Sequence, residues 1–387
     1  MAGYTYLQNL LKAIRLSDKQ TDICLLMRSG ENVSTGPARA LTELADQVFE
    51  GPSLHLQRWS LEWVQAQVYR RALGRERPDR SLNDLLEAKH VEVVFGSWWQ
   101  YPGSSVFPSV GLCVWIHDFQ FVHFPHFYDA RTLQATRRGI RRWADVADRV
   151  VVSSRDALKD LVSFDSGVGP KTRVLPFVAE MPDQAYACDP KGVVRHYHLP
   201  EKFIYLPNQF WQHKNHGLVL EALRILAGRG VHPHIVCTGM PQDSRLDTYF
   251  ADVLRQVAEW RLHEQLRVLG LVPMDHVRAL MRQAICILNP SLFEGWSSTV
   301  EEAKSLGKRL LLSDLAVHQE QDPPAAVFFD PRDAEGLAVK LGAIWQECEP
   351  GPDLSLEALA RQSLPTRMRE FGETFLEIMQ EACPARR

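Results

Sequence analysis

The sequence lacks the features of several large protein classes. It has no apolar run long enough to span a membrane and no secretory signal at its start, so we expect a cytoplasmic protein. Its 7 cysteines and 14 histidines contain no C-x-x-C or H-x-x-x-H pair, which argues against a zinc site and for separate, reduced thiols. A net charge of -3 over 387 residues gives no reason to expect a nucleic-acid partner.

Familiar nucleotide and hydrolase motifs are absent as well. The chain has no G-x-G-x-x-G fingerprint, no Walker loop and no G-x-S-x-G turn. It also has no D-x-D, the carboxylate pair that usually clamps a metal ion onto a diphosphate. We therefore expect neither a metal ion nor another cofactor, and the protein's own groups would have to neutralise a bound diphosphate.

Short apolar runs alternate with longer amphipathic stretches along nearly the whole chain. The strand candidates are Ile23–Met27, Val91–Phe95, Leu112–Ile116, Arg149–Ser153, Arg173–Phe177, Phe203–Leu206, His234–Thr238, Leu266–Leu269, Ala284–Leu288 and Arg309–Leu312. The helix candidates are Ala130–Ala147, Gly217–Arg229, Leu246–Glu259, Met274–Arg282 and Thr299–Leu306. Such alternation predicts an α/β fold with doubly wound parallel sheets, whose ligands gather at the carboxyl ends of the strands.

The length favours two domains over one large sheet. The alternation pauses between about residues 178 and 202, where Pro182, Pro190 and Pro200 interrupt a polar stretch. We predict an N-terminal domain over 1–180, a linker over 181–201, a C-terminal domain over 202–365 and a last helix over 366–387 that could cross back to the first domain. At the start, a turn at Gly3 leads straight into a helix, so the first sheet either lacks its first strand or begins with the usual second one.

Residues 291–302 hold the densest group of reactive side chains. A strand candidate stops at Pro290, and Gly295 and residues 297–299 lead into a helix that Glu294 and Glu302 flank. Helix N-termini attract phosphate groups, and carboxylates accept hydrogen bonds from sugar hydroxyls. The pattern predicts a ligand that is part phosphate and part polyol, although glutamates near a helix start also fit a solvated helix face.

Two other strand ends carry polar side chains. His117 and Asp118 follow the apolar run that ends at Ile116, and Lys214 lies just before a predicted helix start. A cation at a helix N-terminus is unfavourable unless an anion lies between the two. Each residue taken alone also fits a plain interpretation, a loop histidine with satisfied hydrogen bonds and a solvated lysine.

Together these stretches resemble the retaining GT-B glycosyltransferases of family 4, the glycosyl transferases group 1. The E-x7-E motif of that family has its counterpart in Glu294 to Glu302, preceded by an Asn-Pro-Ser run. The segment around Lys214 resembles the family's phosphate-binding lysine, His117 its first-domain histidine, and Gly3 its glycine turn on the side of the nucleotide-sugar donor. Asn208 stands where the family often has an arginine.

The resemblance implies a GT-B fold, with two Rossmann-like doubly wound domains that face an interdomain cleft. It implies transfer of a hexose from a nucleotide-diphosphate sugar to a hydroxyl of a glycan or lipid-linked acceptor, with retention and without a metal. The catalytic residues would be His117 at the sugar, Glu294 at its hydroxyls and Lys214 at the diphosphate. The donor-binding residues would be Glu302 at the ribose, with Gly295, Trp296, Ser297, Ser298, Thr299, Asn208, Leu271, Val272 and Gly3.

Some alternatives stay open. A basic helical run with Arg137, Arg138, Arg141 and Arg142 is either a solvated face or a peripheral contact with an anionic membrane surface. The chain could also be a GT-B-fold sugar-nucleotide epimerase, an inverting transferase, or a non-catalytic interaction protein that keeps the fold.

Overall fold

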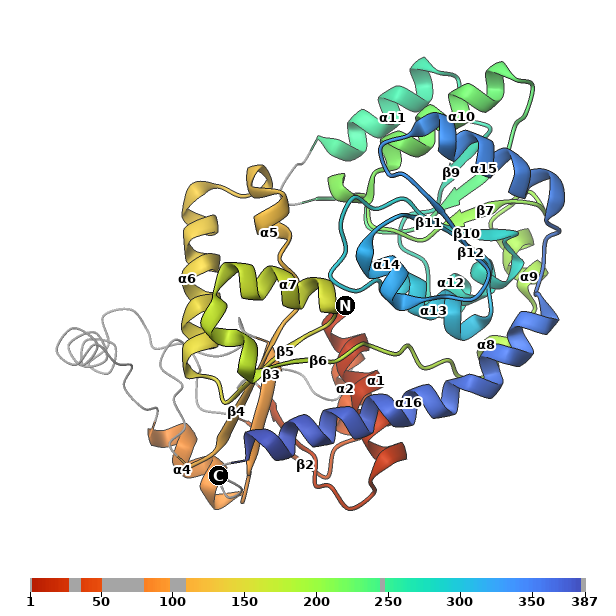
Figure 1. Cartoon of the computed structure of the whole chain (residues 1–387). Coiled ribbons are helices and arrows are strands. Elements are labelled where there is room, and N and C mark those ends of the chain that lie inside the picture. Colours follow the sequence, from red (N-terminus) through yellow and green to blue (C-terminus); the bar gives the residue numbers. More distant parts are fainter. Residues whose placement is uncertain (1, 28–35, 51–79, 98–108, 244–247, 384–387) are drawn as a thin grey trace. The chain divides into compact units, whose positions relative to one another are not determined.

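The computed structural model describes residues 2–27, 36–50, 80–97, 109–243 and 248–383. The chain divides into two compact units, and each contains more than one stretch of sequence. Unit 1 consists of Met1–Phe119, Asp129–Val178 and Thr366–Arg387, and unit 2 of Gln120–Tyr128 and Ala179–Pro365. Figure 1 shows strands and helices alternating along both units.

Unit 1 contains a four-stranded parallel sheet in the order β3-β4-β5-β6 and a parallel pair, β1-β2. The strands are β1 Cys24–Met27, β2 Gln47–Glu50, β3 Val93–Ser97, β4 Gly111–Ile116, β5 Arg149–Val152 and β6 Thr172–Val174. The helices are α1 Ala2–Ser17, α2 Gly36–Thr42, α4 Arg80–Ala88, α6 Ala130–Val146, α7 Arg155–Phe164 and η2 Ser166–Lys171. The last part of α16, Leu354–Ala382, completes this unit.

The end of α16 is held to unit 1 by close backbone packing and by charge. The hydroxyl of Ser17 on α1 donates to the carbonyl of Arg369 at 2.8 Å, and a Cβ on Gly372 would overlap the carbonyl oxygen of Ala13. Glu381 accepts hydrogen bonds from Arg149 and Arg173 beneath β5 and β6. Residues 366–382 are therefore an integral layer of this unit.

Unit 2 contains a six-stranded parallel sheet in the order β12-β11-β10-β7-β8-β9. Its strands are β7 Ile204–Leu206, β8 Ile235–Cys237, β9 Leu266–Val268, β10 Cys286–Asn289, β11 Leu310–Ser313 and β12 Ala326–Phe329. Its longer helices are α10 His216–Gly228, α11 Tyr249–Glu259, α12 Met274–Gln283, α13 Ser298–Leu306 and α15 Ala334–Glu347. Shorter elements are α5 Gln120–His123, η1 Pro125–Phe127, α8 Asp183–Ala187, α9 Pro190–His196, η3 Gln212–Lys214 and α14 Ala316–Gln321.

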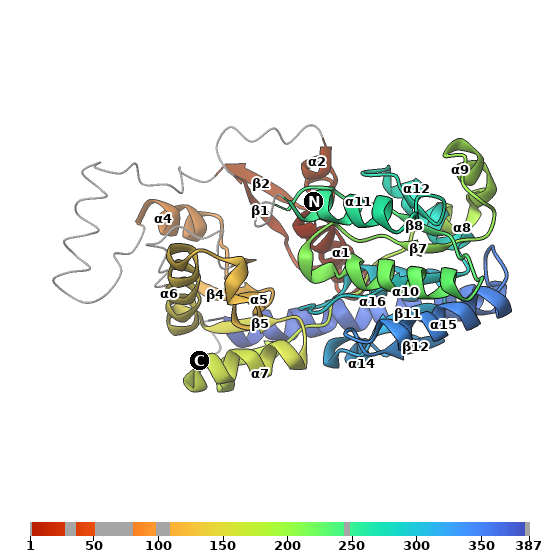
Figure 2. The same ribbon diagram turned by 90° about the horizontal axis from the view of Figure 1, so that it is seen from above.

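The strand order of unit 2 reverses between β7 and β10. The chain starts at β7, moves outward to β8 and β9, and returns to place β10 on the other side of β7. Right-handed crossovers then put α10 and α11 on one face of the sheet and α12, α13 and α14 on the other, as Figure 1 shows; Figure 2 gives the view from above. Ligands of doubly wound sheets bind at such a reversal, at the carboxyl ends of the strands.

The core of unit 2 explains why its strands are so uniformly apolar. All residues of β7, β8, β10 and β11 are buried, because helices cover both faces of the sheet. Phe210, Leu223 and Leu337 fill the space between this sheet and α10 and α15, each with no exposed surface. The polar residues that end these strands are therefore exceptions that need a separate explanation.

Most of the predicted elements are confirmed. Each predicted strand coincides with an observed one, with ends that differ by a few residues, and the α/β class with parallel sheets is correct. Strands β2 and β12 were not predicted, because both are short and partly exposed and so show weak patterns. All seven cysteines are free thiols, as expected.

The stretch 181–201, predicted as a linker, is not an extended connection. It forms α8 and α9, and Tyr197 just after α9 bonds through its hydroxyl to Nδ1 of His276 on α12 at 2.7 Å. Pro182 and Pro190 stand at the N-termini of these two helices, and Asp189 caps the second by accepting from the Lys191 N–H. Proline is favoured at the first turn of a helix, so these prolines start helices here instead of breaking them.

Two further expectations concerned the chain ends. The helix predicted over 366–387 is the last part of α16, which starts earlier, at Leu354, and ends at Ala382; the part from Thr366 on belongs to unit 1. The expected turn at Gly3 is wrong, because Gly3 is the second residue of α1. In the described ranges no strand precedes β1, and β1 pairs with β2.

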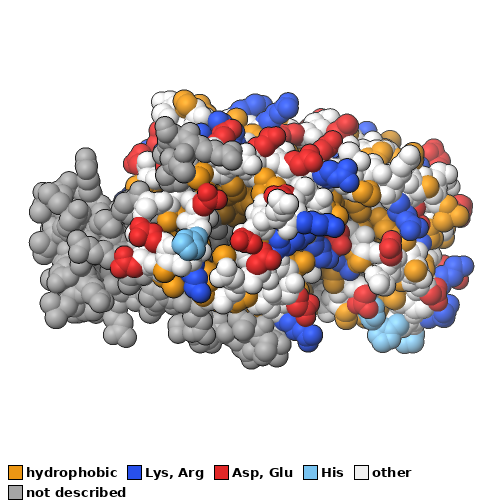
Figure 3. All heavy atoms as spheres, turned by 90° about the horizontal axis from the view of Figure 1, so that it is seen from below, with side chains coloured by type: hydrophobic (Ala, Val, Ile, Leu, Met, Phe, Trp, Pro, Cys, Tyr) orange, Lys and Arg blue, Asp and Glu red, His pale blue; other side chains and the backbone are white. Residues whose placement is uncertain are grey.

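The described surface is mixed in charge. Figure 3 shows acidic and basic side chains interspersed on the face that it presents, in line with the small net charge of -3. Across the described residues, no helix combines the length and apolar character needed to cross a membrane.

Candidate active site at the ends of β7 and β10

An amide–amide hydrogen bond joins the carboxyl ends of the two central strands of unit 2. Asn208 follows β7, and Asn289 is the last residue of β10. Nδ2 of Asn208 donates to Oδ1 of Asn289 at 3.1 Å, and the two residues are 3% and 0% exposed. We call this contact the amide bridge. Since the strand order reverses here, the amide bridge lies where a doubly wound sheet is expected to bind its ligand.

A buried ion pair lies beside the amide bridge. Nζ of Lys214, the last residue of η3, is 2.6 Å from Oε1 of Glu294, and the two side chains are only 12% and 9% exposed. A hydrogen bond of 2.7 Å from the Leu292 N–H to the His213 carbonyl ties the loop after β10 to the loop after β7. The two predicted catalytic residues of this unit are thus direct partners.

The ion pair fixes the charge of the carboxylate. Burial would raise the pKa of Glu294, but the positive charge of Lys214, with smaller contributions from His318 and His213, lowers it to about 2. Glu294 is therefore ionised at any ordinary pH. In that form it is a hydrogen-bond acceptor only, suited to hydroxyl groups.

The N-terminus of α13 is the third part of this site. Ser297 is its N-cap, with Oγ accepting from the Val300 N–H, while Gln321 bonds both the N–H and the carbonyl of Ser297. The N–H groups of Ser298 and Thr299 have no acceptor within the helix, because they belong to its first turn. Two free donors and the positive end of the helix dipole make this turn suited to an anion.

The two adjacent glutamates of α13 have different surroundings. Glu301 is 2% exposed and accepts from Nε2 of Gln321 at 3.1 Å, so it is part of the support of the helix and not of a solvated face. Burial raises the pKa of Glu302 to about 7, against the opposing charge of Arg278. Perturbed pKa values of this kind are frequent at functional sites.

The carboxyl ends of β8 and β9 continue the same edge of the sheet. Gly239 follows β8 with a φ of 138°, and a Cβ there would overlap the carbonyl of Asn208, so only glycine lets the two strand ends approach. Leu271 follows β9 and is 54% exposed, and Val272 is next to it. These two predicted residues therefore lie at the edge that carries the amide bridge.

Unit 1 carries the remaining predicted residues. His117 follows β4, and its ring lies 3.6 Å from the ring of Trp115, which in turn stacks on Tyr6 of α1 at 3.7 Å. Nε2 of His117 is 3.1 Å from the Ser97 hydroxyl. Burial lowers the pKa of His117 to about 3, so the imidazole is neutral. Gly3 lies on the exposed side of α1.

The structure therefore gathers Asn208, Lys214 and Glu294 into one bonded cluster with the first turn of α13, and it places His117 and Gly3 in the other unit. Gly295 and Trp296 are half-buried in the loop between Glu294 and Ser297. The sequence-based interpretation gave no role to Asn289, Ser291 or Gln321. For Asn289 and Ser291 the signal was the position of polar side chains at and just after the end of a buried strand, which is unusual for a core element.

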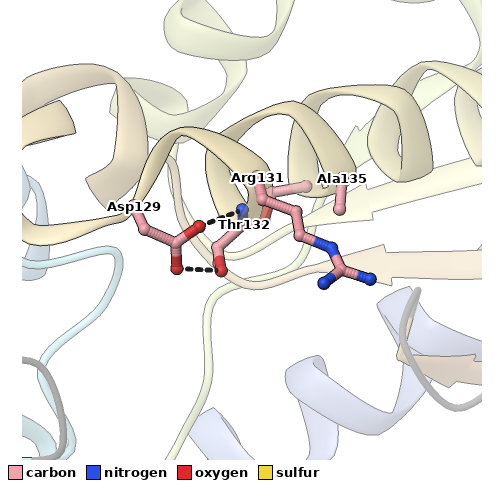
Figure 4. A pocket seen from close by; sticks show the side chains of 5 residues that line it. Asp129, Arg131, Thr132 and Ala135 are labelled. Atoms are coloured by element: carbon pink, nitrogen blue, oxygen red, sulfur yellow. Dashed lines mark hydrogen bonds between the residues drawn. The ribbon is translucent and has the colours of Figure 1, made fainter.

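A further pocket of the described chain lies at the start of α6. Figure 4 shows a shallow hollow at the start of α6, lined by Asp129, Arg131, Thr132, Ala135 and Thr136. Both oxygens of Asp129 are occupied by Thr132, through its N–H at 2.8 Å and its hydroxyl at 2.6 Å, so this carboxylate acts as a helix cap. Across the described ranges, no group of three or more metal-ligating side chains is placed to hold a metal ion.

Comparison with solved structures defines the class of fold. A glycosyltransferase from Rickettsia africae covers 97% of this chain and 94% of its own, with a TM-score of 0.64 and 15% identity. HepE from Anabaena, solved with UDP and glucose, covers 96% of this chain and 95% of its own, with a TM-score of 0.65 and 12% identity. Sucrose-phosphate synthase from Thermosynechococcus elongatus covers 94% of this chain and 95% of its own, with a TM-score of 0.55 and 15% identity. The fold is GT-B, as predicted.

The family comparison points to the same class. Residues 201–347 match the family model described as Glycosyl transferases group 1, and this range contains the amide bridge, the ion pair and α13. No curated protein sequence matches the chain. The family match and the structural neighbours together support a glycosyltransferase of GT-B fold.

The environment of Glu302 leads to a pH-dependent prediction. Because the pKa of Glu302 is raised from 4.5 to about 7 by folding, its ionisation costs more in the folded than in the unfolded protein. Relative to Glu302→Gln, the wild type should lose up to about 3 kcal/mol of unfolding free energy as the pH rises from about 4.5 to above 7. Urea unfolding over a pH series measures this, with Glu259→Gln as a control on α11. A difference that does not vary with pH would contradict the burial of Glu302.

Proposed function

We propose that the chain transfers a hexose from a nucleotide-diphosphate sugar to a hydroxyl of a glycan or lipid-linked acceptor, with retention of anomeric configuration. The observation that carries the proposal is the bonded cluster of Lys214, Glu294 and the first turn of α13. It combines hydrogen-bond donors for phosphate with an ionised acceptor for sugar hydroxyls. The match of residues 201–347 to the group 1 family and the UDP-glucose complex of HepE support this choice of ligand.

The chemical demand of the reaction fits these groups. As the bond from the anomeric carbon to the diphosphate oxygen breaks, positive charge builds up on the sugar and negative charge on the diphosphate. Lys214 and the N–H groups of Ser298 and Thr299 would stabilise the leaving diphosphate. Because Glu294 already offsets part of the charge of Lys214, the helix N-terminus has to supply the rest.

Each of the remaining residues would bind a different part of the nucleotide sugar. Glu302 would bind the ribose hydroxyls, and Leu271 and Val272 would contact the base. Glu294, with Gly295 and Trp296 beside it, would bind hydroxyls of the transferred sugar. Asn208 would act from within the amide bridge, since its amide is already bonded to Asn289.

Unit 1 would supply groups near the reacting carbon. His117 would contact the sugar as a neutral imidazole, in line with its lowered pKa, and Gly3 would lie on the side of the nucleotide sugar. Retention would follow from attack of the acceptor hydroxyl on the face that the diphosphate leaves, with a phosphate oxygen taking the proton. The bond to the acceptor oxygen then replaces the bond to the diphosphate, and no metal ion takes part.

The location that suits this reaction is the cytoplasm, at the inner face of a membrane where a surface polysaccharide is built. Arg137, Arg138 and Arg141 on α6 are exposed and support an electrostatic contact with anionic lipid. Trp143 is 3% exposed and lies under the Arg142 guanidinium, so the contact would use charge and not an inserted aromatic side chain.

The substitution Lys214→Ala gives the most direct test of the activity. A thermal-shift panel of nucleotide sugars first identifies the ligand, and turnover is then measured for Lys214→Ala. Loss of a charge that stabilises the leaving group should lower turnover by about 100- to 1000-fold. Lys191→Ala, which removes an exposed lysine of α9, is the control. Normal turnover of folded Lys214→Ala would remove this residue from the mechanism.

The stereochemistry of the product separates the proposal from its alternatives. Proton NMR of the anomeric signal should show the configuration of the nucleotide sugar preserved in the product. An inverted product would identify an inverting transferase, and a nucleotide sugar with one altered ring carbon would identify an epimerase. Binding of the nucleotide sugar without any turnover would favour a non-catalytic protein.

A further inference from the structure

The two oxygens of the Glu294 carboxylate are used unequally. Oε1 accepts from Nζ of Lys214 at 2.6 Å, from the Ser291 hydroxyl at 2.7 Å and from Nδ2 of Asn289 at 3.4 Å. Oε2 has no hydrogen-bond donor within the part of the chain that the structure describes. A carboxylate can accept about four hydrogen bonds in all, so the protein saturates one oxygen and leaves the other available.

Ser291 is built to hold this arrangement. The residue has no exposed surface, and its hydroxyl lies between Oε1 of Glu294 and Oδ1 of Asn289, at 2.7 and 2.6 Å. The hydroxyl has a single hydrogen, so it donates to one of these oxygens at a time, and the charged carboxylate oxygen is the stronger acceptor. Hydrogen bonds to an ionised acceptor are short and strong, so this contact restrains the carboxylate more than a neutral contact would.

The side chain of Asn289 connects Glu294 to the two neighbouring parts of the site. Its amide nitrogen donates to the Ser297 hydroxyl at 2.9 Å as well as to Glu294, and its oxygen accepts from Asn208 and lies 2.6 Å from the Ser291 hydroxyl oxygen. The N-cap of α13 and the carboxylate are thus bonded to the same buried amide. A shift of Asn289 would displace the phosphate-binding turn and the sugar-binding carboxylate together.

We propose that Ser291 and Asn289 are positioning residues that anchor Glu294 through Oε1 and so make Oε2 the oxygen that accepts a hydroxyl of the transferred sugar. The inference rests on the proposed function. It adds the carboxylate oxygen that would bind the sugar hydroxyl and the two residues that would orient this carboxylate. Pre-organisation of this kind matters because a small misplacement of a contact group costs much of its binding energy. Lys214 and Glu294 can then remain paired while each contacts its own part of the ligand.

The inference separates binding of the nucleotide from binding of the sugar. A free nucleoside diphosphate lacks the transferred sugar and so offers no hydroxyl of that sugar to Oε2; its binding should therefore not depend on Ser291. We define the sugar increment as the Kd of the free diphosphate divided by the Kd of its sugar conjugate. Titration calorimetry on the full chain with UDP and UDP-glucose, and with GDP and GDP-mannose, gives this ratio for each variant.

Ser291→Ala should lower the sugar increment about tenfold and change the Kd of the free diphosphate less than twofold. Ser305→Ala is the matched control, because Ser305 is equally buried and donates a 2.7 Å hydrogen bond to the Ala179 carbonyl without any tie to Glu294. It should leave both quantities unchanged. Asn289→Ala should weaken both the free diphosphate and the sugar increment, since its amide also holds Ser297.

Three results would overturn the inference. Equal weakening of diphosphate and conjugate by Ser291→Ala would make Ser291 a general structural residue. An unchanged sugar increment would show that Glu294 does not depend on it. A wild type that binds the diphosphates without any sugar increment would remove Glu294 from sugar recognition, whereas a wild type that binds none of the four ligands would refute the proposed function itself.

Discussion

The reversal of strand order between β7 and β10 is the constraint on which the rest of the site depends. It places the carboxyl ends of two central strands next to each other and sends the helices that follow them to opposite faces of the sheet. The buried edge between them has to be closed by polar groups that satisfy one another, because water is excluded there. Asn208 and Asn289 do this through the amide bridge, and the loops that carry Lys214 and Glu294 start from it.

Charge balance explains how such polar groups can be buried. A lone Lys214 or a lone Glu294 at this depth would be costly, whereas the pair at 2.6 Å with further hydrogen bonds is tolerable. The cost of desolvation is thereby met before any ligand arrives. The geometry of the charged groups is also fixed in advance, which is the property that electrostatic stabilisation of a leaving group requires.

The sequence predicts the elements well because buried parallel strands have a strong local pattern. The predicted runs that end at Leu206 and Leu288 are short and apolar, and both strands are present. The contact between Asn208 and Asn289 could not be predicted, because it depends on the strand order of the sheet and not on distance along the chain. The same holds for Gln321, which reaches Ser297 from a helix two elements later.

Some errors arose from residues whose meaning depends on position. Pro182 and Pro190 indicated a linker but lie at the starts of helices. Glu301 and Glu302 are neighbours on α13, and their local sequence does not reveal how each is buried. Packing against α14 makes the first a support for the helix and leaves the second with a pKa raised by burial.

The most direct test of the central claim is a crystal structure of the full chain with the nucleotide sugar that it binds. The account predicts the diphosphate within hydrogen-bond distance of Nζ of Lys214 and of the N–H groups of Ser298 and Thr299. It also predicts a sugar hydroxyl on Oε2 of Glu294, with the contact between Ser291 and Oε1 unchanged. A diphosphate bound away from the ends of β7 and β10, or a sugar that reaches Glu294 only through Oε1, would contradict it.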